Sequence, residues 1–349
     1  MPESAQTVHV DGFELIADAD LTPRTTFGVP ARARWLARVT DPAALPQLLE
    51  RREFRDLPRL TLGGGSNLLF TRDFEGLVLA IESQGIERLD SGKDGDLLRV
   101  AAGENWDAFV RWSLEQGYAG LENLILIPGS VGAAPFQNIG AYGTEIREFV
   151  RGVRAWDSRE EEFVWLDNDA CEFAYRDSIF KRQRGRWLIT ELELLLPHEA
   201  PPRIHYPGVR EALETVGIPE PRPTDVARVV EDLRRSKLPD PAITGNAGSF
   251  FKNPVRDATT VDDLKRRFPH LPFHELSDGR CKLSAAWLIE QTGFRGYRQG
   301  AVGVSEQHAL VLVNLGGATG AEVWALAERI RECVQQQFGI LLEPEPVVL

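Results

Sequence analysis

The stretch Gly63-Gly64-Gly65-Ser66-Asn67 follows directly on a short run, Arg59 to Leu62, that predicts a β-strand. Consecutive glycines expose backbone N–H groups, and the serine and asparagine add polar side chains, which together suit a phosphate. The spacing matches neither the G-x-G-x-x-G fingerprint nor a Walker loop, since no GK[ST] is present. Taken alone, the stretch is equally compatible with a glycine-rich turn between two strands.

A second run of small residues extends from Pro128 to Pro135 and continues from Gln137 to Gly143. Such a run allows backbone to lie flat against a large planar ligand or its pyrophosphate, because few side chains intervene. The alternative is close packing between two backbone segments. Two such loops in the first 145 residues favour a dinucleotide bound in extended form.

Strands and helices alternate along the chain without a regular period. Leu97–Ala101 and His308–Leu315 are expected as strands, and Leu283–Gln291 and Ala321–Gln337 as helices. This mixture predicts α+β domains rather than a barrel or solenoid. A length of 349 residues predicts two or three domains.

Composition narrows the class of protein. The formal net charge is -12, which argues against nonspecific binding to nucleic acid. Three widely separated cysteines and six scattered histidines predict neither a disulfide framework nor a metal site. No apolar run is long enough to span a membrane, and no signal-peptide pattern opens the chain, so we expect a cytoplasmic protein.

Three further strings carry candidate chemistry. Arg176, within Tyr175–Phe180, can clamp a carboxylate with two parallel hydrogen bonds, although a structural ion pair with Asp177 is the commoner arrangement. Ser249 lies in a constrained glycine loop, Gly245–Pro254, where its hydroxyl could give or take a proton; an ordinary turn serine is the alternative. Glu345 lies between prolines that would hold it in place, or in a solvated acidic tail.

Taken in order, these strings resemble the UDP-N-acetylenolpyruvoylglucosamine reductases. The resemblance rests on GGGSN, the 128–143 stretch, YRDSIF, KLPDP, GNAGSFFKNP and the terminal LEPE, with Thr26-Phe27-Gly28 near the start. Any one match is weak, but the ordered set extends from Gly63 to Glu345 and is highly specific.

The resemblance implies a two-subdomain FAD-binding fold of the vanillyl-alcohol-oxidase/p-cresol methylhydroxylase type, followed by an α+β substrate-binding domain. The expected boundaries are 1–84 and 85–235 for the two subdomains, 236–335 for the substrate-binding domain, and 336–349 for a segment returning to the active site. The residues expected to bind FAD noncovalently are Gly63, Gly64, Gly65, Ser66, Asn67, Pro128, Gly129, Ser130, Gly132, Ala133, Gln137, Asn138, Gly140, Ala141 and Tyr142.

The family reaction implies roles for the three candidate catalytic residues. NADPH passes hydride to the flavin, which delivers it to C3 of the enolpyruvyl ether of a UDP-amino sugar; protonation at C2 then gives UDP-N-acetylmuramate for peptidoglycan synthesis. Ser249 matches the proton donor to C2. Arg176 and Glu345 match positions beside the substrate carboxylate, where Glu345 would need its proton to donate a hydrogen bond.

Other matches concern the substrate. Tyr206 matches a tyrosine on a loop that closes over the nucleotide in one subgroup, and Lys237 and Asn253 match substrate-contacting positions. No metal is implied, and a monomer is favoured.

Two alternatives remain open. The first is an FAD-dependent oxidase of the same fold acting on a small alcohol or sugar, although neither glycine stretch holds the histidine or cysteine to which many such enzymes attach their flavin. The second is a nucleotide-sugar binding protein that has lost catalysis. The joint presence of Arg176, Ser249 and Glu345 argues against it.

Overall fold

The computed structural model describes residues 7–206 and 208–349, which form two compact units. The first unit contains the chain up to Ala19, Ala33–Gly64 and Glu75–Arg234. The second contains Asp20–Arg32, Gly65–Phe74 and Arg235–Leu349. Both units are therefore built from segments that are distant in sequence.

The first unit contains a five-stranded sheet with the strand order β1-β2-β3-β6-β4. Its strands β4 and β6 run parallel, and the short helix α1 (Leu45–Leu49) buries its leucines in the core. The strand bounds are β1 Thr7–Val10, β2 Phe13–Asp20, β3 Arg32–Val39, β4 Arg59–Leu62 and β6 Phe74–Ile81.

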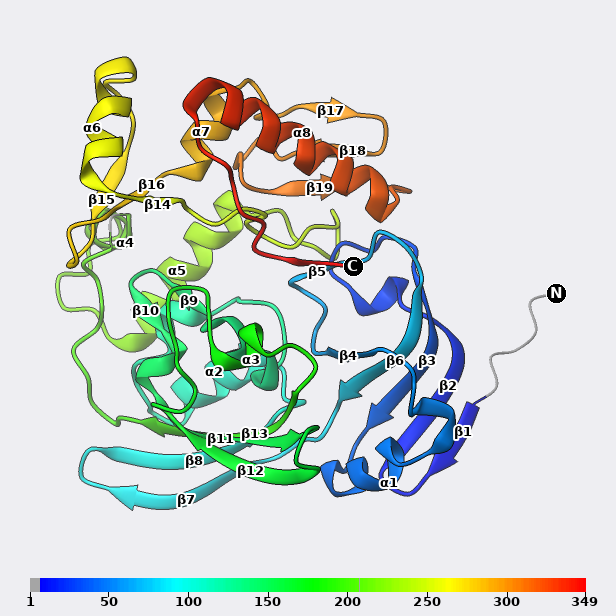
Figure 1. Ribbon diagram of the computed structural model, residues 1–349. Coiled ribbons are helices and arrows are strands. Elements are labelled where there is room, and N and C mark those ends of the chain that lie inside the picture. Colours follow the sequence, from blue (N-terminus) through cyan, green and yellow to red (C-terminus); the bar gives the residue numbers. More distant parts are fainter. Residues whose placement is uncertain (1–6, 207) are drawn as a thin grey trace. The chain divides into compact units, whose positions relative to one another are not determined.

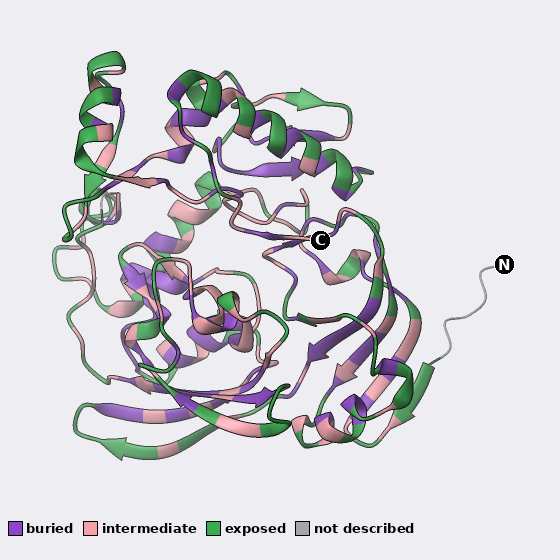
Figure 2. Cartoon of the chain, viewed as in Figure 1, coloured by how far each residue is buried: buried purple, intermediate pink, exposed green. Residues whose placement is uncertain are grey.

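A second sheet of the first unit is antiparallel, with the order β12-β11-β13-β8-β7 (Figure 1). Alternation along β13 sends Leu192 and Leu194 into the core, while Glu191 and Glu193 lie on the outer face beside Arg154 and Arg99. Figure 2 shows buried and intermediate stretches along the strands of this sheet. The bounds are β7 Ile86–Gly92, β8 Gly95–Ala101, β11 Val150–Asp157, β12 Glu162–Asp167 and β13 Trp187–Leu196.

Helix α2 (Trp106–Glu115) belongs to the core of the first unit. The Asn105 side chain accepts a hydrogen bond from the Ala108 N–H and so caps its start, while Trp106 and Phe109 are buried. The remaining regular elements of the unit are β9 Gly140–Ala141, β10 Thr144–Glu145, α3 Ile179–Arg182, α4 Val209–Thr215 and α5 Pro223–Lys237, the last of which continues into the second unit.

The second unit has its own hydrophobic core, which includes Phe250, Phe251 and the apolar face of α8 (Gly320–Phe338). Thr319 and Glu322 form a capping box at the start of α8, and Gly339 ends it in a left-handed conformation. The other bounds are β5 Leu68–Leu69, β14 Val255–Arg256, α6 Ala258–Arg267, β15 Phe273–Glu275, β16 Cys281–Leu283, α7 Ala285–Gln291, β17 Arg298–Gln299, β18 Val302–Val304, β19 Leu312–Asn314 and β20 Val347–Val348.

The end of the chain joins the second unit through a parallel strand pair. Strand β20 pairs with β5, with Val347 opposite Leu68 and Val348 opposite Leu69. The N–H of Leu349 donates to the carbonyl of Leu69, and the N–H of Thr71 donates to the carbonyl of Leu349. This pairing fixes the backbone just after Glu345.

Candidate active site

In the first unit, Gly63 and Gly64 of the first predicted small-residue loop lie against the second such loop. A Cβ atom added to Gly64 would lie 2.7 Å from the Cα of Gly129, and one added to Gly63 would lie 2.7 Å from Oγ of Ser130 and 3.0 Å from Cβ of Ala133. A larger residue at Gly64 would therefore displace the Gly129 backbone, and one at Gly63 would displace the Ser130 side chain. The two loops therefore present a closely packed surface of nearly bare backbone, which fits the pyrophosphate or ring of FAD.

Backbone hydrogen bonds hold the second loop against the unit's core. The N–H of Trp106 donates to the carbonyl of Gly129 (3.0 Å), and the N–H of Gly132 donates to that of Ala102 (2.8 Å). Beyond this point, Gly140 and Ala141 form β9, which pairs with β10. Backbone hydrogen bonds to neighbouring segments thus help to set the shape of the loop.

Arg176 is attached to the same loop. Its Nη2 donates a 2.5 Å hydrogen bond to the carbonyl of Gly140, and its backbone adopts a left-handed conformation with φ of 54°. Asp177 pairs with Arg182. The structure thus places the Arg176 side chain against Gly140 of the predicted cofactor loop.

Two further side chains join the Arg176 segment to the loop. Asn138 is fully buried and donates from Nδ2 to the carbonyl of Ala174 (3.0 Å) and to Oε2 of Glu145 (3.0 Å). Lys181 lies with Nζ 3.5 Å from Oε1 of Gln137. Buried, satisfied amides of this kind rigidify a site.

Tyr142 and Tyr206 are in contact. Their rings meet edge to face with centroids 5.3 Å apart, while 46% of Tyr206 remains exposed. The structure therefore brings the predicted nucleotide-closing tyrosine against a residue of the predicted cofactor loop. Burial raises the pKa of Tyr142.

Arg234 was not predicted, yet it belongs to this region. Its Nη2 donates to the carbonyl of Leu126 (3.2 Å), and its buried Nε makes no hydrogen bond within residues 7–206 and 208–349. Burial lowers the pKa of Arg234, although the nearby Tyr142 opposes that shift. The sequence signal was available, because Arg234 comes four residues after the buried Val230 on α5.

Ser249 and Glu345 lie in the second unit on adjoining segments. The N–H of Glu345 donates a 2.8 Å hydrogen bond to the carbonyl of Phe250, and the N–H of Lys252 donates to that of Glu343 (2.9 Å). Phe250 follows Ser249 directly. Asn67, which follows Ser66 in this unit, donates from Nδ2 to the carbonyl of Glu345 (3.3 Å).

Lys237 and Asn253 also belong to the second unit. Oδ1 of Asn253 accepts a hydrogen bond from the Ala285 N–H at the start of α7 (3.0 Å), which orients the side-chain amide. His308 is near Lys237; burial, followed by the charge of Lys237, lowers the pKa of His308. Its Nδ1 accepts from the Leu310 N–H (3.3 Å).

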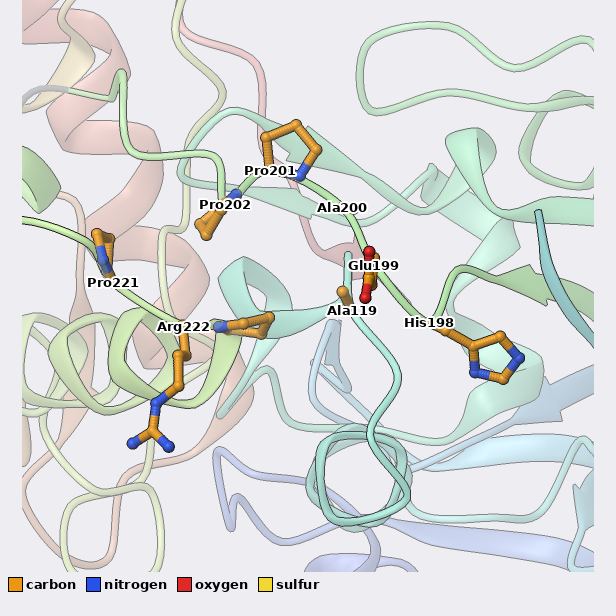
Figure 3. Close-up of a pocket in the computed structure, with 9 residues that line it drawn as sticks. Ala119, His198, Glu199, Ala200, Pro201, Pro202, Pro221 and Arg222 are labelled. Carbon is orange, nitrogen blue, oxygen red and sulfur yellow. The ribbon is translucent and has the colours of Figure 1, made fainter. Parts of the chain in front are cut away.

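An open hollow of about 570 Å³ in the first unit is separate from these residues. Prolines 201, 202, 221 and 223 line it together with Ala119, Glu199 and Ala200. Figure 3 shows the side chains of His198 and Arg222 on different sides of it. None of the site residues predicted from the sequence lines this hollow.

Comparison with known proteins settles the family. An FAD-binding domain model matches residues 33–167, and a model of the UDP-N-acetylenolpyruvoylglucosamine reductase C-terminal domain matches residues 240–349. The UDP-N-acetylenolpyruvoylglucosamine reductase of Pseudomonas aeruginosa is 52% identical over 333 residues, covering 95% of this chain and 98% of that protein. The chain belongs to the UDP-N-acetylenolpyruvoylglucosamine reductase family. The reductase of Chromobacterium violaceum is 48% identical over 95% of this chain and 98% of its own.

A solved structure agrees on the fold. The UDP-N-acetylenolpyruvylglucosamine reductase of Thermus caldophilus superposes with a TM-score of 0.65 at 24% identity and covers 96% of this chain and 98% of that one. The chain is thus an FAD-containing oxidoreductase of peptidoglycan precursor synthesis, with NADPH as reductant. Since these relatives are reductases, the oxidase alternative is set aside.

The described part of the chain shows neither a metal site nor a membrane-spanning helix. In residues 7–206 and 208–349, no group of three or more His, Cys, Asp or Glu side chains is arranged to hold a metal ion. No helix in that part of the chain is both long enough and apolar enough to cross a membrane.

Proposed function

We propose that Arg176, Ser249 and Glu345 are the catalytic residues for reduction of UDP-N-acetylglucosamine enolpyruvate to UDP-N-acetylmuramate. The observation that carries this assignment is the hydrogen bond between the Glu345 N–H and the carbonyl of Phe250. It supports a shared role for Ser249 and Glu345, because the bond joins Glu345 to the residue that follows Ser249. Family membership supplies the reaction that the three side chains would serve.

Gly63, Gly64 and the 128–143 segment are the residues that would hold FAD in the first unit. Bare backbone leaves N–H groups available to phosphate oxygens, and the hydrogen bonds of Asn138 keep the segment from rearranging. When bound, FAD supplies hydride transfer between NADPH and the substrate. The protein's task is to orient the substrate and supply charge and a proton.

Arg176 would bind the substrate carboxylate. Its hydrogen bond to Gly140 fixes one edge of the guanidinium, so the remaining N–H groups point in a defined direction. As C3 gains hydride, the C2=C3 double bond breaks and negative charge moves onto C2 and the carboxylate. A fixed cation stabilises that charge without reorganising, which is usually a large catalytic effect.

Ser249 would hold the proton that C2 receives. The hydroxyl O–H bond breaks as the new C2–H bond forms, and solvent then restores the proton to Oγ. A serine hydroxyl is a weak acid, so this step depends on accurate placement. The short ladder between 250–252 and 343–345 supports such placement, since it fixes both Ser249 and Glu345 through backbone.

Lys237, Asn253 and Tyr206 would bind the nucleotide part of the substrate. Lys237 offers a positive charge suited to a diphosphate, and Asn253 offers Nδ2. Tyr206 is exposed, with its ring resting on Tyr142, so it has the freedom to meet a nucleotide. We also infer a cytoplasmic monomer; the three free cysteines fit a reducing compartment.

The direct test is anaerobic stopped-flow absorbance of the FAD-loaded protein. NADPH should bleach the flavin, and UDP-N-acetylglucosamine enolpyruvate should restore its oxidised spectrum with formation of UDP-N-acetylmuramate. Ser249→Ala should keep the first step and slow the second by about 10² or more. Ser305→Ala removes the hydroxyl of a different serine of the second unit, one that is buried, and serves as the control.

Two outcomes would contradict the assignment. Reoxidation of Ser249→Ala by the enolpyruvyl substrate at the wild-type rate would remove Ser249 from proton transfer. A wild-type flavin that stays reduced until air is admitted would point to an oxidase instead.

A further inference from the structure

Asn246 has an unusual place among the polar side chains of the second unit. It is only 3% exposed and precedes Ser249 by three residues. A buried amide must satisfy both its N–H groups and its oxygen, or destabilise the fold. Asn246 satisfies them all with backbone groups near residues that the proposed function assigns to catalysis and substrate binding.

The oxygen of Asn246 supports the serine loop directly. Oδ1 accepts a 2.9 Å hydrogen bond from the N–H of Gly248. Gly248 has φ of 66°, a left-handed conformation that this bond helps to hold, and Ser249 is the next residue. The direction in which the chain enters Ser249 is therefore set by the Asn246 side chain.

The amide nitrogen of Asn246 reaches in the other direction. Nδ2 donates to the carbonyl of Pro239 (3.0 Å) and to that of Thr244 (2.8 Å). Pro239 comes two residues after Lys237, the proposed diphosphate contact. One side chain thus joins the Lys237 segment to the Ser249 loop.

The base of this arrangement is rigid. The Asn246 N–H donates to the carbonyl of Thr26 (3.0 Å), and Gly245 lies so close to Phe27 that an added Cβ would be 2.2 Å from its carbonyl oxygen. Asn314 holds Gly245 and Phe27 together, because its N–H donates to the carbonyl of Gly245 and its Nδ2 donates to the carbonyl of Phe27. These contacts hold the backbone of Asn246 in place.

Ser249 is also fixed on its other side. The Phe250 N–H donates to the carbonyl of Leu310 (2.8 Å), and the Phe250 carbonyl accepts from Glu345. Ser249 lies between this anchor and the Asn246–Gly248 hydrogen bond. Loss of Asn246 would release one end of the loop and leave the other in place.

We propose that Asn246 is a positioning residue, which holds Ser249 for proton transfer and keeps the Lys237 segment in register with it. This inference rests on the proposed function, because it needs Ser249 as proton donor and Lys237 as a substrate contact. Displacing a reacting group by about 1 Å can cost about 10²-fold in rate. Asn246 would therefore affect the substrate half of the reaction while leaving reduction by NADPH unchanged.

Two variants separate the roles of the oxygen and the amide nitrogen. Asn246→Ala removes both. Asn246→Ser keeps an oxygen able to accept from the N–H two residues later, but it is too short to reach Pro239. Each FAD-loaded variant would be bleached with NADPH anaerobically and then mixed with increasing UDP-N-acetylglucosamine enolpyruvate, with Ser305→Ala as the matched buried-polar control.

Asn246→Ala should reoxidise about 10- to 100-fold more slowly at saturating substrate, with the NADPH step within twofold of wild type. Asn246→Ser should recover most of the saturating rate but keep a raised half-saturating substrate concentration. This split distinguishes positioning from general stabilisation, which would slow both half-reactions alike. If Asn246→Ala does not fold, Asn246→Ser still tests the split.

Three results would overturn the inference: a saturating reoxidation rate of Asn246→Ala within twofold of wild type, equal losses in both half-reactions, or no change in half-saturation for Asn246→Ser. Ser249→Ala, measured alongside, separates this failure from that of the proposed function. Normal reoxidation of Ser249→Ala would refute the proposed function. Blocked reoxidation of Ser249→Ala beside a normal Asn246→Ala would refute the positioning role alone.

Discussion

The hydroxyl of Ser178 donates a 2.6 Å hydrogen bond to the carbonyl oxygen of Phe136. Together with the bonds from Arg176 to Gly140 and from Asn138 to Ala174, it fastens the segment carrying Arg176 to the small-residue loop. Ser178 also caps α3, because its Oγ accepts from the Lys181 N–H. One short side chain therefore maintains both a helix start and a contact between two predicted site segments.

Ser178→Ala should lower the free energy of unfolding by about 1–3 kcal/mol, because it leaves the Phe136 carbonyl without its partner and removes a helix cap. Urea unfolding and the FAD content of the purified protein would measure the effect. Ser158→Ala is the matched control, since Oγ of Ser158 is buried without a hydrogen-bond partner in the described chain. Equal stability of the two variants would contradict the role of Ser178.

Arg176→Lys should retain FAD and yet slow reoxidation by the enolpyruvyl substrate by about 10²–10³-fold. Lysine keeps the charge but not the planar fork that Gly140 orients. The measurement is the substrate half-reaction at saturating substrate. Arg182→Lys, which alters an arginine paired with Asp177 and Glu172, should stay near wild type; a near-normal rate for Arg176→Lys would argue against a directed guanidinium.

Gly64→Ala should weaken FAD binding and lower stability by about 1–3 kcal/mol, because its Cβ would come within 2.7 Å of the Gly129 backbone. Absorbance at the flavin band and thermal unfolding would report the two effects. Gly92→Ala, whose Cβ would meet the Gly95 carbonyl only at 3.3 Å, provides the comparison. Full FAD occupancy in Gly64→Ala would show that the loops need not lie so close.

Asp96 predicts a pH dependence of stability. It is fully buried and accepts hydrogen bonds from Ser91 and Tyr118, each at 2.7 Å, beside His198. Burial alone would raise the pKa of Asp96, but these two bonds and His198 lower it to about 2. A folded-state pKa below the ordinary 3.8 means that the carboxylate's contribution is complete above that value and lost as the pH falls towards 2.

Tyr118→Phe should therefore cost about 1.5 kcal/mol at pH 7 and clearly less near pH 2.5, where Asp96 begins to gain a proton. Urea unfolding at both pH values measures the difference. Tyr297→Phe is the control, because it removes a hydroxyl that accepts a hydrogen bond from Arg329 and is not bonded to Asp96. The cost of this variant should not change as Asp96 gains a proton. A cost for Tyr118→Phe that is constant from pH 7 to 2.5 would exclude the carboxylate as its cause.

Local signals in the sequence predicted several elements of the fold. The helix expected over 321–337 is α8, and the strand expected over Leu97–Ala101 forms most of β8. In the structure, Gly63 and Gly64 lie against the run after Pro128, as a ligand shared by the two loops would require. These features follow from periodicity and residue size, which are readable from neighbouring residues alone.

Elements without a local signal were missed. Strand β7 is largely exposed and rich in charge, and β11 interleaves arginines with its apolar residues, so neither has a clear strand pattern. The pairing of β5 with β20 depends on residues from two distant parts of the chain. The sequence gives no local signal for the role of Asn246, because its hydrogen bonds to Pro239 and Gly248 exist only once the loop is folded.

The second unit is assembled from segments that are far apart in the sequence, and this arrangement has a consequence for synthesis on the ribosome. Asp20–Arg32 and Gly65–Phe74 emerge early, but the rest of their unit begins only at Arg235. At about 5–20 residues per second, roughly ten to thirty seconds separate Phe74 from Arg235. Throughout that interval β5 has no β20 to pair with. Leu68 and Leu69 therefore stay without their β20 partner until the last residues of the sequence have been made.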